Sequence, residues 1–204
     1  MNLEKYRQYS RIARGMEDAD LVLKDARIVN VFTEEIIRGD IAIQDGIIAG
    51  IGSFHGKEER NLAGKYVCPG FIDSHLHLES TLVTPAELVT VASRHGTTTF
   101  IVDPHESANV SGLKGIDYIL EQTENVKANV YVMMPSCVPA TVIDDNGCTL
   151  TAEDMAPYLH NSRILGLGEV MDSISVVQGD KTMHDKLELF EGRIRDGHAP
   201  FLEE

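Results

Sequence analysis

The spacing of apolar residues changes along the chain and divides it into two parts. Between Leu3 and Met16 apolar side chains recur at helical spacing, which predicts a short amphipathic helix over residues 3–16. From residue 20 to residue 67, β-branched and apolar runs alternate with turn residues and predict strands. Asp45-Gly46 lies between two such runs and indicates a hairpin, because Gly accepts positive φ. Residues 1–67 therefore predict a helix and a small antiparallel, β-sandwich-like domain, although an edge sheet of one larger domain would give the same pattern.

After residue 67 the pattern predicts strands and helices in alternation. A strand through His75 and His77 is followed by predicted strands at 97–102, 129–134 and 164–169. Helices are predicted at 84–95, at 111–124, from Thr151 onward and at 181–194. Strands of near-continuous apolar character that alternate with helices indicate a parallel sheet. We therefore expect an α/β fold in which residues 68–204 form the first half of a (β/α)8 TIM-type barrel, because a complete barrel takes ~250 residues.

Polar residues gather at or just beyond the carboxyl ends of the expected strands. They are His75, His77, Asp103-Pro104-His105-Glu106, Pro135-Ser136, Glu169 and His198. The active sites of β/α barrels are built at this end of the strands. One such coincidence would mean little, but several in register predict a site.

The residue types in this set indicate metal-dependent hydrolysis. His75 and His77 alternate along an extended segment, so their imidazoles project from the same face and can share a divalent ion. A bare His-x-His is more often only a strand with two histidines. Glu169 lies between apolar residues, where a carboxylate is costly to bury without a cation or hydrogen-bond partners. We expect Glu169 to bridge two metal ions as the catalytic carboxylate, with His198 as a ligand of the second ion.

The run Asp103-Pro104-His105-Glu106 is open to three interpretations. His105 and Glu106 would line the substrate pocket and bind substrate. Asp103 would support a ligand histidine through a hydrogen bond. A plain strand-to-helix turn with Asp103 as the N-cap accounts for the run almost equally well.

Composition and charge narrow the function classes. The 204 residues are 43% hydrophobic and carry 18 basic against 32 acidic residues, for a net charge of −14. That charge repels phosphate backbones and anionic membranes, so neither nucleic acid nor a membrane is expected as a partner. No apolar run approaches the ~18 residues of a membrane span and no signal segment is evident, so a cytoplasmic location is expected. The three cysteines indicate neither a disulfide framework nor a thiol nucleophile.

Several longer segments resemble the amidohydrolase superfamily, and within it the adenine deaminase family. They lie at 69–80, which contains Pro-Gly-Phe-Ile-Asp-Ser-His-Leu-His, and at 102–110, 134–140, 167–171 and 196–200. The resemblance extends over essentially residues 1–200. It implies a binuclear divalent metal centre, commonly Mn²⁺ or Fe²⁺ with Zn²⁺ as an alternative. Glu169 matches the glutamate that replaces the bridging carboxylated lysine of many relatives.

The same resemblance implies adenine or a related purine as substrate, deaminated at C6 to hypoxanthine and ammonia while a carboxylate carries the proton. The histidine expected after a sixth strand and the aspartate expected after an eighth have no counterpart here. We therefore expect an N-terminal portion of such an enzyme, with little or no turnover alone. A homo-oligomer is expected as well, because half a barrel leaves sheet edges uncovered. Another amidohydrolase, such as a cyclic amidase or an N-acetyl-sugar deacetylase, and a non-catalytic metal-binding module remain as alternatives.

Overall fold

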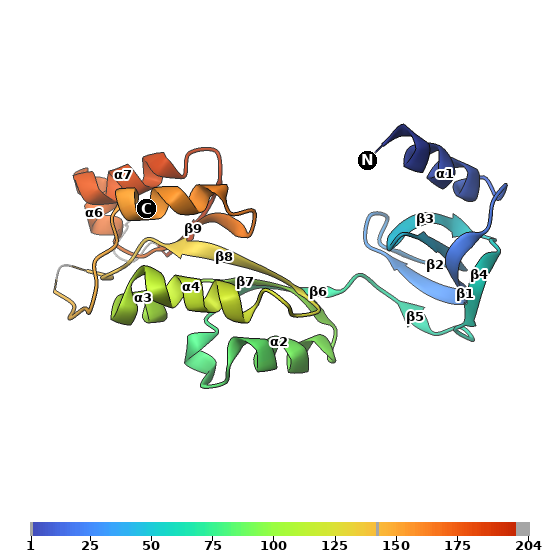
Figure 1. The fold of residues 1–204 in the computed structure, drawn as a ribbon, viewed down its shortest axis with the longest axis horizontal. Helices are drawn as coiled ribbons and strands as arrows, with labels where there is room; N and C mark the ends of the chain where they lie inside the picture. The colour runs from blue at the N-terminus through green and yellow to red at the C-terminus, as the bar shows by residue number, and fades with distance from the viewer. Residues whose placement is uncertain (1, 142, 199–204) are drawn as a thin grey trace. The chain divides into compact units, whose positions relative to one another are not determined.

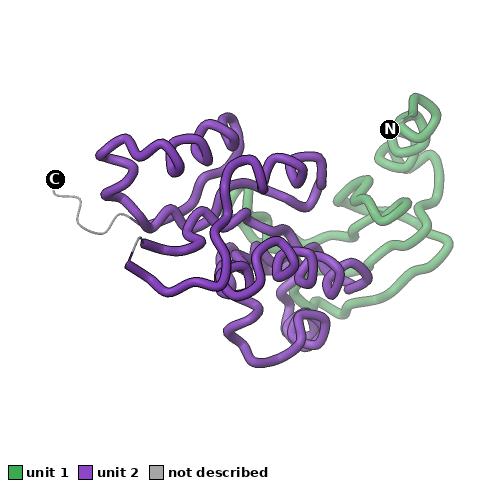
Figure 2. The backbone as a smooth tube through the Cα atoms, turned by 60° about the vertical axis from the view of Figure 1, so that its left-hand side comes forward, with its two compact units in different colours: residues 1–69 green, residues 70–204 purple. Residues whose placement is uncertain are grey.

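The computed structural model describes residues 2–141 and 143–198 and divides the chain into two compact units. Unit 1 comprises Met1–Pro69 and unit 2 comprises Gly70–Glu204 (Figure 2). Each unit has its own sheet (Figure 1). Each also has its own cluster of buried hydrophobic side chains. Within the described ranges, no helix is long and apolar enough to cross a lipid bilayer.

Unit 1 combines one helix with a five-stranded sheet in the order β3-β2-β1-β4, in which β5 also pairs with β1. Its elements are α1 (Leu3–Ala13), β1 (Ala19–Asn30), β2 (Glu35–Gln44), β3 (Ile47–Gly52), β4 (Gly56–Asn61) and β5 (Tyr66–Val67). Asp45 and Gly46 join β2 to β3 with φ of 51° and 75°, the conformation of the predicted tight hairpin. The pairs β1–β2 and β2–β3 are antiparallel as predicted, but β4 and β5 pair with β1 in parallel. The predicted antiparallel sheet is confirmed for β1, β2 and β3, whereas β4 and β5 depart from it because after β3 the chain crosses to the other side of β1.

Unit 2 is built on a sheet of five strands in the order β10-β9-β8-β7-β6. These are β6 (Phe71–Leu76), β7 (Thr97–Val102), β8 (Asn129–Pro135), β9 (Ile164–Val170) and β10 (Ile194–Gly197). All neighbouring pairs are parallel, so the five carboxyl ends meet at one edge of the sheet. The predicted α/β class, a partial barrel sheet with a separate small β domain, is confirmed.

The helices of unit 2 connect successive strands of this sheet (Figure 1). They are η1 (Glu79–Thr81), α2 (Pro85–Ser93), α3 (His105–Ser111), α4 (Leu113–Gln122), α5 (Ala152–Met155), η2 (Ala156–His160), α6 (Ser173–Gln178) and α7 (Lys181–Leu189). Thr151 and Asp154 form the predicted capping box at the start of α5. The single helix predicted over 111–124 was wrong at its start. Gly112, with φ of 63° and ψ of −140°, separates α3 from α4, and only glycine adopts that conformation without strain.

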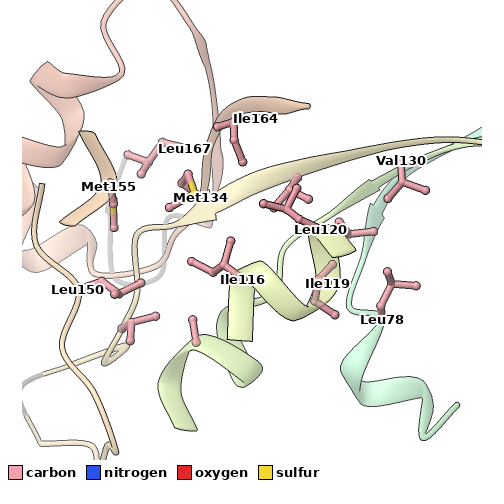
Figure 3. Close-up of a cluster of buried hydrophobic side chains, with 14 of the residues drawn as sticks. Leu78, Ile116, Ile119, Leu120, Val130, Met134, Leu150, Met155, Ile164 and Leu167 are labelled. Carbon is pink, nitrogen blue, oxygen red and sulfur yellow. The ribbon is translucent and has the colours of Figure 1, made fainter. Parts of the chain in front are cut away.

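The main core of unit 2 lies between α4 and the sheet. Ile116, Ile119 and Leu120 share one face of α4 and belong to the same buried cluster as Val130 and Met134 of β8 (Figure 3). Their i, i+3, i+4 spacing is that of a helix with one apolar face. Each such side chain contributes about 1.5–3 kcal/mol when it is fully buried. This packing fixes the strands whose ends carry the polar residues.

Candidate metal centre

Residues from four strand ends come together at the carboxyl edge of the unit 2 sheet. His75 lies in β6 and His77 directly follows it, Asp103 follows β7, His105 begins α3, Glu169 lies in β9 and His198 follows β10. The parallel order of the strands explains this convergence, because all five carboxyl ends lie on the same side. The predicted ligands His75, His77, Glu169 and His198 are therefore neighbours in the fold, although up to 123 residues apart in the sequence, from His75 to His198 (198 − 75).

His75 and His77 direct their Nε2 atoms at each other across 3.1 Å. The Nδ1 atom of His77 lies 2.8 Å from the main-chain carbonyl oxygen of Asp103, and Nδ1 of His75 lies 3.2 Å from Oδ2 of Asp196. Since carbonyl and ionised carboxylate oxygens only accept hydrogen bonds, each Nδ1 carries a proton and donates it. In neutral rings both Nε2 atoms then present lone pairs to each other, which is unfavourable without a cation between them.

Glu169 supplies the negative charge at the centre of the cluster, and only 4% of its surface is exposed. Its Oε1 lies 2.9 Å from Nε2 of His75, 3.6 Å from Nε2 of His77 and 3.1 Å from Nε2 of His198. Its Oε2 lies 2.9 Å from Nδ1 of His105. Burial by itself would raise the pKa of Glu169, but the hydrogen bond with His198 and the nearby imidazoles outweigh it and lower that pKa. The carboxylate therefore stays ionised at neutral pH.

These donors fit a divalent cation. Ligand atoms of His75, His77 and Glu169 lie within 4.8 Å of one another, and so do those of a second group, His105, Cys137 and Glu169. Oε2 of Glu169 and Nδ1 of His105 are buried without a hydrogen bond of good geometry. Imidazole nitrogens and carboxylate oxygens that converge with unused lone pairs are the ligands that first-row divalent ions take in proteins.

Asp103 lies beside this cluster and is 2% exposed. Neither of its carboxyl oxygens has a hydrogen bond, and Oδ1 is 3.9 Å from Nδ1 of His105. Burial, reinforced by the charge of Glu169, raises the pKa of Asp103 well above its ordinary value. The expected support of a ligand histidine is made by the main-chain carbonyl of Asp103, not by its side chain. The N-cap interpretation was wrong, because Pro104 is the N-cap of α3.

The two residues predicted to bind substrate have different surroundings. His105 faces Glu169, and burial lowers the pKa of His105, so its imidazole is neutral at pH 7. Glu106 accepts a hydrogen bond from the Ser80 hydroxyl and lines a separate cavity of about 400 Å³ with Glu79. Among residues 2–141 and 143–198, no hydrogen bond or ion pair joins Glu106 to Glu169 or to an imidazole. Substrate binding by either residue stays a prediction.

Asp196 and Ser136 also belong to the site. Ser136 was among the strand-end residues that predicted it, but the pattern along the chain assigned no specific role to either residue. Asp196 accepts a hydrogen bond from Nδ1 of His75, and the Ser136 hydroxyl donates to the main-chain carbonyl of Glu169 at 2.8 Å. A signal for Asp196 was its position two residues before His198, because residues i and i+2 of a strand share a face. The role of Ser136 depends on the pairing of β8 with β9, which has no local signal.

The chain is similar in sequence to amidohydrolases. The profile of the amidohydrolase family matches residues 66–198. The adenine deaminase of Desulfitobacterium hafniense (strain Y51) is 56% identical over 204 residues, which are all of this chain and 36% of that protein. An adenine deaminase of Clostridium acetobutylicum is 50% identical over 190 residues, or 92% of this chain and 33% of the relative. The chain thus spans about a third of the length of the curated relatives it matches.

A solved structure shares the fold. The crystal structure of N-isopropylammelide isopropylaminohydrolase from Burkholderia multivorans matches with a TM-score of 0.53 over 88% of this chain and 53% of that chain. The two sequences are 17% identical there, so this likeness concerns the fold alone.

Proposed function

The chain belongs to the amidohydrolase family of metal-dependent hydrolases, and we propose that its strand-end cluster holds the divalent metal centre of an adenine deaminase. The reaction adds water at C6 of adenine and releases ammonia and hypoxanthine. Relatives named adenine deaminase, 44% to 56% identical to this chain, support the choice of substrate. The observation that carries the proposal is the facing pair of Nε2 atoms of His75 and His77 beside the ionised Glu169.

We propose that the centre binds two ions, either Mn²⁺ or Fe²⁺, with Zn²⁺ as the alternative. His75, His77 and Glu169 would hold one ion. Glu169 and His198 are the ligands that we propose for the second ion, and His105 and Cys137 are further donors close to Glu169. When bound, such ions lower the pKa of water from ~15.7 towards ~7, so hydroxide is available near neutral pH.

The surrounding residues hold protons in place for this chemistry. Asp196 and the carbonyl of Asp103 keep the protons of His75 and His77 on Nδ1, which leaves both Nε2 atoms free as ligands. Glu169 remains a carboxylate and balances the charge of the ions. His105, whose imidazole is neutral at pH 7, would contact the purine beside Glu169. Glu106 would line the path by which the substrate reaches the site.

We also propose that the protein acts as a homo-oligomer in the cytoplasm, without a nucleic-acid or membrane partner. The net charge of −14 supports the last point, because it repels polyanions.

Adenine turnover by the native protein tests the proposed activity. The protein would be tagged at its N terminus and isolated from its own host, so that any continuation of the chain is retained, and then loaded with Mn²⁺. Release of ammonia and formation of hypoxanthine would be measured with adenine as substrate. Glu169→Gln should lower the rate by about 100-fold or more, because it removes the bridging charge. Glu188→Gln, an exposed change on α7, should leave the rate as it is.

A panel of other substrates distinguishes the alternatives. Hydrolysis of a cyclic amide or an N-acetylated sugar in place of adenine would replace the proposed substrate while keeping the metal centre. Bound metal without turnover of any of these substrates would contradict the proposed activity and favour a non-catalytic metal-binding module.

A further inference from the structure

Lys186 is a buried cation that the metal centre does not use directly. Only 6% of its surface is exposed, and it lies on α7, which follows β9 and precedes β10 in the chain. Its Nζ donates a hydrogen bond of 2.7 Å to the main-chain carbonyl of Ser136. No ion pair with a carboxylate is found for Lys186 in the part of the chain that the structure describes. A buried ammonium group is costly, and here the compensation comes from the hydrogen bond to Ser136 and from the more distant charges of Asp180 and Asp154.

Ser136 connects Lys186 to two main-chain carbonyl groups, those of Gly168 and Glu169. Ser136 is 1% exposed, and its N–H donates to the carbonyl of Gly168 at 3.2 Å. Its hydroxyl donates to the carbonyl of Glu169 at 2.8 Å. One buried serine therefore binds two successive carbonyls of β9 while its own carbonyl accepts from Lys186.

The backbone that Ser136 binds is strained. Glu169 has φ of 27°, inside the left-handed region that non-glycine residues seldom adopt. Such a conformation persists only where surrounding contacts over-determine it. At this position it also decides where the carboxylate lies, because the imidazoles of His75 and His198 approach one oxygen of Glu169 at 2.9 and 3.1 Å.

We propose that Lys186 and Ser136 are positioning residues that hold the Glu169 main chain in its left-handed conformation and thereby keep its carboxylate at the metal centre. Lys186 orients the peptide group of Ser136 through its hydrogen bond to the Ser136 carbonyl. Ser136 in turn fixes the Glu169 main chain through the hydrogen bond from its hydroxyl to the Glu169 carbonyl. Neither residue is among the proposed ligands of the ions. The inference rests on the proposed metal centre but concerns how the fold builds it.

Co²⁺ is a suitable probe, because its d–d absorption reports ligand geometry without any need for turnover. The 204-residue chain would be stripped with a chelator and titrated with Co²⁺ at pH 7, as wild type and as Lys186→Met and Ser136→Ala. The matched controls are Lys181→Met, an exposed lysine on the same helix, and Ser93→Ala, a serine whose hydroxyl also binds a main-chain carbonyl. Circular dichroism at each titration would establish that the variant is folded.

Both site variants should bind Co²⁺ about 10- to 100-fold more weakly, with an altered d–d spectrum, while both controls match wild type. If Lys186→Met does not fold, Ser136→Ala decides, because it removes only the hydroxyl bond to Glu169. Folded site variants with wild-type affinity and spectrum would overturn the inference alone. A wild-type chain that does not bind Co²⁺ would overturn the proposed metal centre and this inference with it.

Discussion

Replacement of Asp103 by Asn tests the electrostatics of the cluster in the metal-free chain. Asp103 is 2% exposed, and neither carboxyl oxygen has a hydrogen bond. Burial and the charge of Glu169 raise its pKa well above the ordinary value of 3.8. Asp103 is therefore protonated in the folded chain at pH values at which it is ionised in the unfolded chain.

The sign of the pH effect follows from this difference. The folded state binds the proton more tightly, so the contribution of Asp103 to stability is fully present below pH 3.8 and is lost as pH rises towards the folded pKa. Within that window each pH unit costs about 1.4 kcal/mol of unfolding free energy. Asn has nearly the same shape as Asp and no titratable proton, so its contribution to the free energy of unfolding does not depend on pH. Between pH 4.5 and 6.5 the wild type should therefore lose stability relative to Asp103→Asn as the pH rises, by no more than about 1.4 kcal/mol per pH unit.

The assay is urea unfolding in the presence of a chelator, followed by circular dichroism at several pH values for both chains. The histidines titrate in both chains, so their effect largely cancels in the difference between the two unfolding free energies. The transition that belongs to unit 2 is the one that moves on substitution. If the difference between the two unfolding free energies stays constant over this pH range, the conclusion that Asp103 is buried in its protonated form is refuted.

Three further predictions concern burial and packing. Cys137 is 2% exposed, and burial raises its pKa to about 12. Ellman's reagent should therefore modify the exposed Cys68 at once and Cys137 only on unfolding. Early loss of the Cys137 thiol, located by mass spectrometry, would contradict this. Gly168→Ala should destabilise unit 2 by about 1–3 kcal/mol and weaken metal binding, because the new Cβ would lie 2.1 Å from Oδ2 of Asp103; unchanged urea unfolding and metal titration would count against the close packing. Ile116→Ala, at a fully buried position, should cost about 2–5 kcal/mol in urea unfolding, and a change well under 1 kcal/mol would contradict the core packing.

The parts of the fold that local sequence determines could be predicted. Asp45-Gly46 marks a tight hairpin because few residues accept the required positive φ, and Thr151 caps α5 through its own side chain. The parallel pairing of β4 with β1 could not be predicted, because it depends on where the chain crosses in three dimensions. The break at Gly112 was missed because an isolated glycine is also tolerated within helices.

The same division holds for the site. His75 and His77 could be paired from their spacing, and Glu169 could be singled out because its neighbours are apolar. The partners that fix their geometry lie far away in sequence: Asp196 reaches His75, and Ser136 reaches Glu169, only through strand pairing. The left-handed backbone of Glu169 has no sequence signal either, since such strain is imposed by tertiary contacts.

Metal stoichiometry is the measurement that tests the central claim most directly. The chain would be loaded with Mn²⁺ or Fe²⁺, freed of excess ion by gel filtration and examined by elemental analysis, beside His77→Ala and Glu169→Gln. We predict about two ions per wild-type chain, with loss of one or both in the variants, because in the proposed centre His77 is a ligand of one ion and Glu169 is a ligand of both. Folded wild-type chain that retains no metal, or variants that retain as much as wild type, would contradict the metal centre.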